Sequence, residues 1–155
     1  MDNTGKAYFW NSGKMYSKRP WTQEHIDTQR AYFEKERTEK KGNFAEFVVR
    51  MYYLIYKACV ENDGSCCKAK EVRPYRVKDE IYEGIYDSPD HAFRTVINDC
   101  TEHLKLMHYI GMRKNEKDEW MIYLNRPLDF LLEGEHEEYL KKYGITGQAH
   151  FQSEP

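Results

Sequence analysis

Residues 96–125 read VINDCTEHLKLMHYIGMRKNEKDEWMIYLN, and their pattern of apolar residues predicts the central part of the fold. Its first half repeats apolar residues at helical spacing, at Val96, Ile97, Cys100, Leu104 and Met107. Gly111 ends that pattern, and two short apolar runs follow on either side of the charged residues 115–118. In the second run the apolar side chains alternate between two faces, as they do along a strand. The stretch therefore predicts a long helix that leads into a β-hairpin with strands at about 110–114 and 119–124.

The sequence before this stretch contains further helix boundaries. Thr22 can cap a helix that ends at Gly42, and Trp21 and Ile26 have the spacing of a hydrophobic staple. Ser88 followed by Pro89 is typical of another helix start. We expect helices at about 22–41, 44–61, 75–85 and 89–108, a short extended segment at 68–73, and a last helical stretch that is interrupted at Gly134 and reaches Tyr143.

Two of these expected helices differ in polarity. The helix at 44–61 is apolar on every side, which is typical of a helix at the centre of a fold or at an interface. The helix at 22–41 is mostly charged, with Ile26, Tyr32 and Phe33 as its apolar residues. We expect this first helix to pack weakly, or to pack against a partner chain.

The length of 155 residues fits a single domain with its own core. We predict an aromatic and basic arm at 1–20, one domain at 21–143 and a frayed tail at 144–155. The expected fold class is α+β and mostly helical. An extra N-terminal helix and a short C-terminal helix would flank the segment that ends in the hairpin.

The charge balance gives no overall sign of nucleic-acid binding. The net charge is −2, from 24 basic and 26 acidic residues. Basic residues predominate in 1–41 and acidic residues in 126–155. This distribution is compatible with DNA binding, although ordinary solvated charge is the simpler explanation.

The cysteines and the first residues bear on the compartment. The cysteines are Cys59, Cys66, Cys67 and Cys100. The start, MDNTGKAYFW, lacks the basic residues and apolar core of a signal peptide. No run approaches the roughly 18 apolar residues that a membrane span needs. We therefore predict a cytoplasmic protein with reduced thiols and no membrane partner.

No pattern in the sequence indicates an enzyme, a cofactor or a metal site. There is no phosphate-binding glycine loop, nucleophile elbow or His-Glu-x-x-His. Cys66 and Cys67 are adjacent, but they have no Cys-x-x-Cys spacing and no nearby histidine, so we expect no zinc site. Asp99 and His103 stand four residues apart on the long helix, where a solvated pair is expected rather than an acid–base pair.

Aromatic residues make up 15% of the chain, and 13 of its residues are tyrosines. Tyr and Trp are frequent interface anchors, so they predict a homodimer or partner interface. The residues expected there are Tyr52, Tyr53, Tyr56, Trp10 and Trp21. Alternatively, the arm and the central helix cover each other in a monomer.

Over about 44–125 the expected order is helix, extended segment, helix, tight turn, helix, strand, turn, strand. This order resembles the winged helix-turn-helix superfamily. Residues 96–125 carry most of the resemblance, because their long helix passes through Tyr109-Ile110-Gly111 into a hairpin. The resemblance is architectural and has no diagnostic motif. Another small α+β fold is the alternative.

The resemblance implies that the 89–108 helix reads double-stranded DNA and that the hairpin and the arm hold phosphates. The helix residues implied near bases or backbone are Arg94, Thr95, Asn98, Thr101 and Lys105. The implied phosphate contacts are Arg113, Lys114 and Lys117 on the hairpin, with Lys14, Lys18 and Arg19 in the arm. Such a protein would be a transcription regulator, or a replication or plasmid-type factor.

Some residues depart from the pattern of a strong DNA binder. Asp99 and Glu102 lie on or beside the presumed reading face, and the hairpin carries acidic residues at 116, 118 and 119. DNA affinity depends on surplus positive charge. The alternative function is a protein-binding adaptor or inhibitor of a phage or other mobile element. It would use Tyr-rich surfaces or the acidic residues at 133–138.

Overall fold

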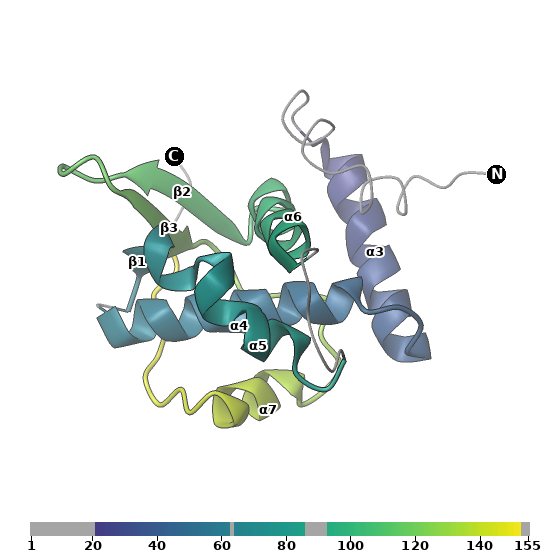
Figure 1. Cartoon of the computed structure of the whole chain (residues 1–155). Helices are drawn as coiled ribbons and strands as arrows, with labels where there is room; N and C mark the ends of the chain where they lie inside the picture. The colour runs from purple at the N-terminus through teal and green to yellow at the C-terminus, as the bar shows by residue number, and fades with distance from the viewer. Residues whose placement is uncertain (1–20, 63, 86–92, 153–155) are drawn as a thin grey trace.

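The computed structural model describes residues 21–62, 64–85 and 93–152, apart from the side chains of Pro74, Tyr75 and Phe93. The fold is α+β and mostly helical, as predicted (Figure 1). Its helices are α3 (Gln23–Glu39), α4 (Phe44–Asn62), the 3-10 helix η1 (Ala69–Val72), α5 (Pro74–Tyr82), α6 (Phe93–Leu106) and α7 (Glu135–Lys142). Its strands are β1 (Cys66–Lys68), β2 (Ile110–Lys114) and β3 (Trp120–Leu124). The predicted arm at 1–20 and the predicted helix start at 89–92 lie outside the described residues.

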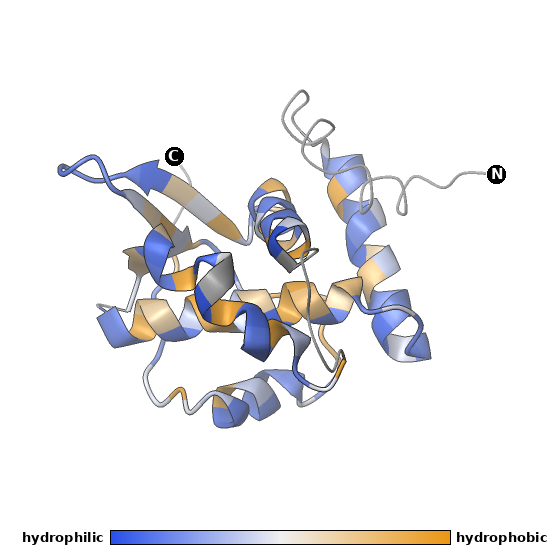
Figure 2. Cartoon of the chain, in the orientation of Figure 1, coloured by the Kyte–Doolittle hydropathy of each residue, from blue (hydrophilic) through white to orange (hydrophobic). Residues whose placement is uncertain are grey.

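Helix α4 crosses the middle of the molecule. Figure 1 shows α7 on one side of it, and α6 with the β2–β3 hairpin on the other. Apolar residues follow α4 along most of its length (Figure 2), and buried side chains occur on nearly every side of the helix. The prediction of a central apolar helix is therefore confirmed, and the remaining elements are placed by how they cover it.

Helix α3 begins with a capping box. The Oγ1 atom of Thr22 accepts a hydrogen bond from the backbone N–H of His25, and Nδ1 of His25 accepts one from the backbone N–H of Thr22, both at 3.2 Å. These two bonds satisfy N–H groups that a helix start otherwise leaves unpaired. The helix ends before Gly42, because Lys40 takes the left-handed conformation at φ 56°.

The expectation that α3 packs weakly is wrong. Its buried residues are Ile26, Gln29, Phe33, Glu36 and Arg37. They recur every three or four positions and so form one face of the helix. The ring of Phe33 lies 5.0 Å from that of Phe130 and 6.2 Å from that of Phe44, centroid to centroid. Polar residues on this face made its sequence look solvated.

The sheet is antiparallel with strand order β1-β3-β2. The strands predicted at 110–114 and 119–124 are confirmed, to within one residue. The extended segment predicted at 68–73 is corrected to the strand Cys66–Lys68 followed by η1. The backbone N–H of Lys68 donates to the carboxylate of Glu71 at 3.3 Å, which favours a tight turn at this point.

The C-terminal part differs from the prediction in two ways. Only Glu135–Lys142 of the predicted last helical stretch is helical, and the loop before it buries Leu128 and Phe130 instead. Residues 144–152 are not frayed. Their backbone is tied down at His150, whose N–H donates to the carbonyl of Gly64 at 2.6 Å. The segment packs back onto α4 and β3 and belongs to the domain.

His103 lies at the centre of an aromatic cluster rather than in solvent. It is fully buried, and its ring centroid is 5.3 Å from Trp21, 6.0 Å from Phe33 and 5.0 Å from Phe44. Its Nδ1 lies 3.1 Å from the backbone carbonyl oxygen of Asp99. Burial lowers the pKa of His103 from 6.5 to about 3, so the ring is neutral in the folded protein. The predicted solvated pair with Asp99 is therefore wrong, because both side chains are buried.

This burial predicts acid sensitivity. As the pH falls from about 6.5 towards 3, the unfolded chain binds a proton at His103 that the folded chain does not bind. Stability is therefore lost in this window. Between about pH 7.5 and pH 5, we expect His103 to reduce the free energy of unfolding by about 2 kcal/mol, measured by guanidinium denaturation.

The matched variant is His103→Leu, which keeps an apolar side chain of similar size at this position. Its unfolding free energy should change less between the same two pH values, by about the same 2 kcal/mol. The carboxylates are identical in the two proteins, so the difference isolates His103. Equal pH dependence in both proteins would contradict a neutral buried His103.

Candidate functional site

Helix α6 has a buried face and an outer face. It contacts α4 and α5 through its buried face, which holds Ile97, Cys100, Leu104 and the aromatic-packed His103. Arg94, Thr95 and Asn98, which the sequence predicts as contact residues, are exposed on the outer face. Helical spacing brings these three side chains together at one end of the helix.

The two other predicted contact residues of this helix, Thr101 and Lys105, already have partners within the helix. The Oγ1 atom of Thr101 donates to the backbone carbonyl of Ile97 at 3.1 Å, and Thr101 is half-buried. The Nζ atom of Lys105 lies 3.3 Å from the carboxylate of Glu102. Lys105 therefore brings little net positive charge to this surface.

The β2–β3 hairpin owes its shape to Asn115 and Gly111. The side-chain oxygen of Asn115 accepts hydrogen bonds from the backbone N–H groups of Lys117 and Glu119, each at 2.9 Å. Gly111 pairs with Tyr123, and a Cβ at Gly111 would lie 2.4 Å from that ring. Only glycine leaves room for the tyrosine ring across this strand.

The predicted basic residues of the hairpin are exposed, but two have partners within the protein. Arg113 donates to the Gln152 side chain at 2.9 Å and lies 4.7 Å from the Tyr123 ring centroid. Lys114 lies 3.1 Å from the Asp118 carboxylate. Trp120, at the start of β3, is 51% exposed, which is unusual for a residue of this size.

A hollow of about 380 Å³ lies between α6, η1 and the sheet. Its apolar walls come from Met51, Ala69, Val72, Ile97, Met112 and Ile122. Its polar rim consists of Arg73, Asn98, Thr101 and Glu102. Asn98 and Thr101 therefore belong both to the hollow and to the predicted contact face of α6.

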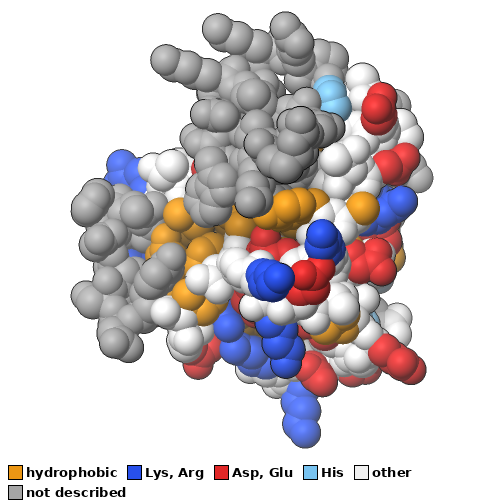
Figure 3. Space-filling model, turned by 90° about the vertical axis from the view of Figure 1, so that its right-hand side faces the viewer, with side chains coloured by type: hydrophobic (Ala, Val, Ile, Leu, Met, Phe, Trp, Pro, Cys, Tyr) orange, Lys and Arg blue, Asp and Glu red, His pale blue; other side chains and the backbone are white. Residues whose placement is uncertain are grey.

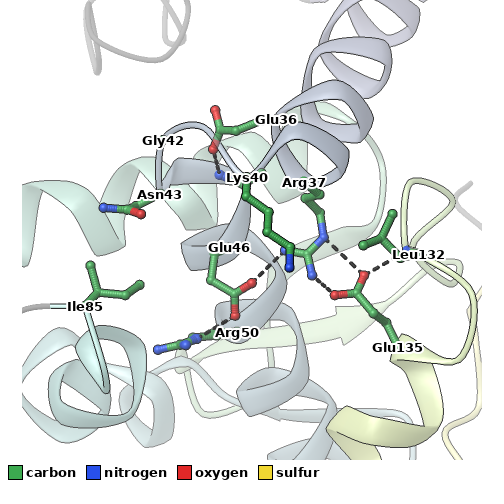
Figure 4. Close-up of a pocket in the computed structure, with 11 residues that line it drawn as sticks. Glu36, Arg37, Lys40, Gly42, Asn43, Glu46, Arg50, Ile85, Leu132 and Glu135 are labelled. Atoms are coloured by element: carbon green, nitrogen blue, oxygen red, sulfur yellow. Dashed lines mark hydrogen bonds and ion pairs between the residues drawn. The ribbon is translucent and has the colours of Figure 1, made fainter.

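A second hollow, of about 300 Å³, is lined mainly by charged side chains where α3 and α4 approach α7 (Figure 4). The Glu46 carboxylate accepts hydrogen bonds from Arg37 at 2.8 Å and from Arg50 at 2.7 Å, and a third from the Tyr139 hydroxyl. Arg37 also pairs with Glu135, with its Nε 3.1 Å from that carboxylate.

The carboxylates of this cluster have unequal surroundings. Burial alone would raise the pKa of Glu46, but the hydrogen bonds from Tyr139, Arg50 and Arg37 outweigh it and lower the pKa. Burial raises the pKa of Glu36, although the Ala45 N–H donates to its carboxylate at 2.7 Å. The Glu36 carboxylate thereby caps the start of α4. Every carboxylate of this cluster has a partner within the chain, and the cluster, called here the charged clamp, ties α3, α4 and α7 together.

The tyrosines predicted as interface anchors are buried. Tyr52 and Tyr53 are 1% exposed and Tyr56 is 6% exposed. The Tyr139 ring of α7 stacks on Tyr53 at 5.1 Å, and the Tyr53 hydroxyl lies 2.7 Å from Nδ1 of His136. The interface interpretation is thus wrong for these tyrosines, because the chain covers them itself: α7 contacts Tyr53 and Tyr56, and the Tyr52 hydroxyl donates to the backbone carbonyl of Arg126 at 2.9 Å.

Of the other predicted interface residues, Trp21 is 8% exposed and packs on His103 and His25, so the interface interpretation is wrong for it as well. Trp10 lies outside the described residues. So do the predicted phosphate contacts Lys14, Lys18 and Arg19.

Comparison with protein-family models, curated proteins and solved structures found no match for this chain. No described helix has both the length and the apolar character to cross a membrane. Within the described ranges, no three His, Cys, Asp or Glu side chains come together as a metal site would need. The four cysteines are free thiols, three of them buried.

Two features escaped the sequence prediction. The charged clamp brings together residues far apart in the chain, such as Arg37 and Glu135. The positions of Ile26, Phe33 and Arg37 on one helical face were the available signal. The apolar hollow is formed by residues of five elements, α4, η1, α6, β2 and β3, and no sequence pattern indicates it.

The clamp predicts a large cost for one isosteric substitution. Glu46→Gln removes the charge that Arg37 and Arg50 share, and the side chains of these arginines are 5% and 11% exposed. We expect a loss of about 2–3 kcal/mol in the free energy of unfolding, because Arg50 loses its carboxylate partner and Arg37 keeps only Glu135. Chemical denaturation would measure it.

Glu39→Gln is the control, since Glu39 pairs at 3.9 Å with Lys35, whose side chain is 74% exposed. An exposed pair of this kind contributes at most about 1 kcal/mol, so this variant should stay close to wild type. Equal losses in the two variants would show that the clamp has no special role in stability.

Proposed function

We propose that this protein binds double-stranded DNA in the manner of a winged helix, with α6 at the major groove. The observation that carries the proposal is the arrangement of α4, β1, α5, α6, β2 and β3 in chain order, with sheet order β1-β3-β2. This arrangement supports the resemblance noted in the sequence. It leaves Arg94, Thr95 and Asn98 of α6 and the basic residues of the hairpin exposed, and a groove could receive both elements.

The outer face of α6 has suitable chemistry. Arg94 can donate two hydrogen bonds to guanine, and the Asn98 amide can pair with adenine. Thr95 is exposed beside them and can bind a base or a phosphate. Exposed side chains on a helix packed firmly by its other face meet the geometric need for reading a groove.

The hairpin would contribute phosphate contacts. Lys117 lies at its exposed turn, and Lys114 is close by on β2. The Lys114–Asp118 pair is exposed, so exchanging Asp118 for a phosphate costs little. Non-specific affinity should then fall as salt rises.

A second candidate function is the docking of a protein partner. It is favoured by the exposed Trp120 on the hairpin, since Trp is a frequent hot-spot residue. The mixed charge around the hairpin also fits a protein surface better than a phosphate backbone. On the face in Figure 3, too, acidic and basic side chains are interspersed.

The first test is fluorescence anisotropy of a labelled random duplex at about 50 and 200 mM salt. We expect binding at low salt that falls steeply at high salt. In a Lys114→Ala/Lys117→Ala variant, the slope of log affinity against log salt concentration should be smaller in magnitude by about 2. The charge-matched control is Lys35→Ala/Lys41→Ala. These lysines are exposed near the end of α3, far from the hairpin (Figure 1).

The two outcomes separate the candidate functions. No binding at low salt would reject DNA binding and leave the protein-partner function, for which Trp120→Ala should weaken partner capture. Equal loss in the hairpin and α3 variants would reject the proposed orientation.

The base-reading role of α6 needs a selected binding site. Once selection from random duplexes yields one, Arg94→Ala and Asn98→Ala should each weaken specific binding by about 1–3 kcal/mol, and the loss should be much smaller on random duplex. Unchanged specificity in both variants would show that α6 does not read the bases.

A further inference from the structure

The hollow between α6, η1 and the sheet has the composition of a small-molecule site. Its floor is formed by Met51 and Ile97, each 1% exposed, Ile122 at 2% and Val72 at 5%. Its volume of about 380 Å³ is at the small end of the range for ligand pockets. A few polar groups lie at the rim of this apolar floor. In many ligand sites, apolar walls contact most of the ligand and a few polar groups fix its orientation.

Among the described residues, the rim offers one cation and one amide without a side-chain partner. Arg73 is exposed between η1 and α5, and its guanidinium makes no ion pair or hydrogen bond with the described residues. The Asn98 amide is likewise without a hydrogen bond in the described part of the chain. The acidic member of the rim, Glu102, is already paired with Lys105 at 3.3 Å. The charge left available at the rim is therefore positive.

We propose that this hollow binds a small amphipathic carboxylate. The apolar part of the ligand lies on Met51, Ile97 and Ile122, and its carboxylate accepts hydrogen bonds from Arg73 and Asn98. A guanidinium and a carboxylate match in geometry and charge. The narrow volume selects an aliphatic or single-ring acid and excludes large cofactors.

The site would also regulate DNA binding, and this part rests on the proposed function. Asn98 and Thr101 line the hollow and lie on the contact face of α6. A carboxylate held by Asn98 removes that amide from base reading and places negative charge where phosphates approach. Ligand and DNA then compete, so each lowers the affinity for the other by the same factor.

The probe is octanoate, titrated by isothermal calorimetry against the full chain without DNA. We expect a Kd of roughly 1 mM, as is reasonable for so few atoms, and binding of octan-1-ol roughly tenfold weaker because it lacks the charge. Arg73→Gln should weaken octanoate binding roughly tenfold. Arg76→Gln, an exposed arginine on α5 that does not line the hollow, should leave the Kd unchanged.

A filling variant tests the location independently. Ala69→Phe places a ring in the hollow from η1 and should abolish octanoate binding, with circular dichroism confirming the fold. If Ala69→Phe does not fold, the Arg73→Gln and Arg76→Gln pair still decides. Octanoate that does not bind wild type, or that binds all variants equally, would overturn the site.

The regulatory part has a separate readout. With octanoate at about ten times its Kd, the apparent Kd of wild type for DNA should rise roughly tenfold, while that of Ala69→Phe stays the same. Octanoate binding with no DNA binding would support the hollow and reject the proposed function. DNA binding that octanoate does not change would overturn the competition alone.

Discussion

The Glu46 carboxylate is the interaction on which the arrangement of the helices depends. It lies on α4 and binds Arg37 from α3, Arg50 from α4 and the Tyr139 hydroxyl from α7. Through Arg37 the network reaches Glu135 at the start of α7. Charges that are largely buried tolerate few geometries, because each must keep its partners. The polar cluster therefore sets how α3 and α7 approach the central helix, while apolar packing supplies most of the stability.

This charged clamp also affects the packing on the opposite side of α4. With α3 held in place, Phe33 closes over His103 from one side and Trp21 from another, so the inner face of α6 is fully covered. With α7 held in place, Tyr139 covers Tyr53, and the tyrosines of α4 become core residues. Arg94, Thr95 and Asn98 on the outer face of α6 and the basic residues of the hairpin stay exposed.

The elements that the sequence predicted correctly are those whose apolar residues repeat with a local period. The apolar residues of α4 and α6 and the alternation in 120–124 placed the central helices and the hairpin correctly, because a buried face repeats with the period of its element. Ion pairs between residues far apart in the chain could not be predicted from the sequence. Arg37 is polar in sequence and buried in structure only because Glu46 and Glu135 meet it, and nothing local indicates those partners. The same holds for Tyr53, which is buried because Tyr139 covers it.

The hairpin's own charge pairing sets the character of any DNA contact. Lys114 is next to Asp118, and Glu119 lies 3.2 Å from Lys68, so a phosphate near either lysine also meets a carboxylate. Because these pairs are exposed, phosphate can replace the carboxylates, but the hairpin then supplies only the salt-dependent, non-specific part of the affinity. Discrimination between DNA sequences must then come from the outer face of α6, where Arg94 and Asn98 are exposed. A protein built this way would bind random DNA at low salt, and at higher salt it would depend on a matching site, or on a second contact from elsewhere, for useful affinity.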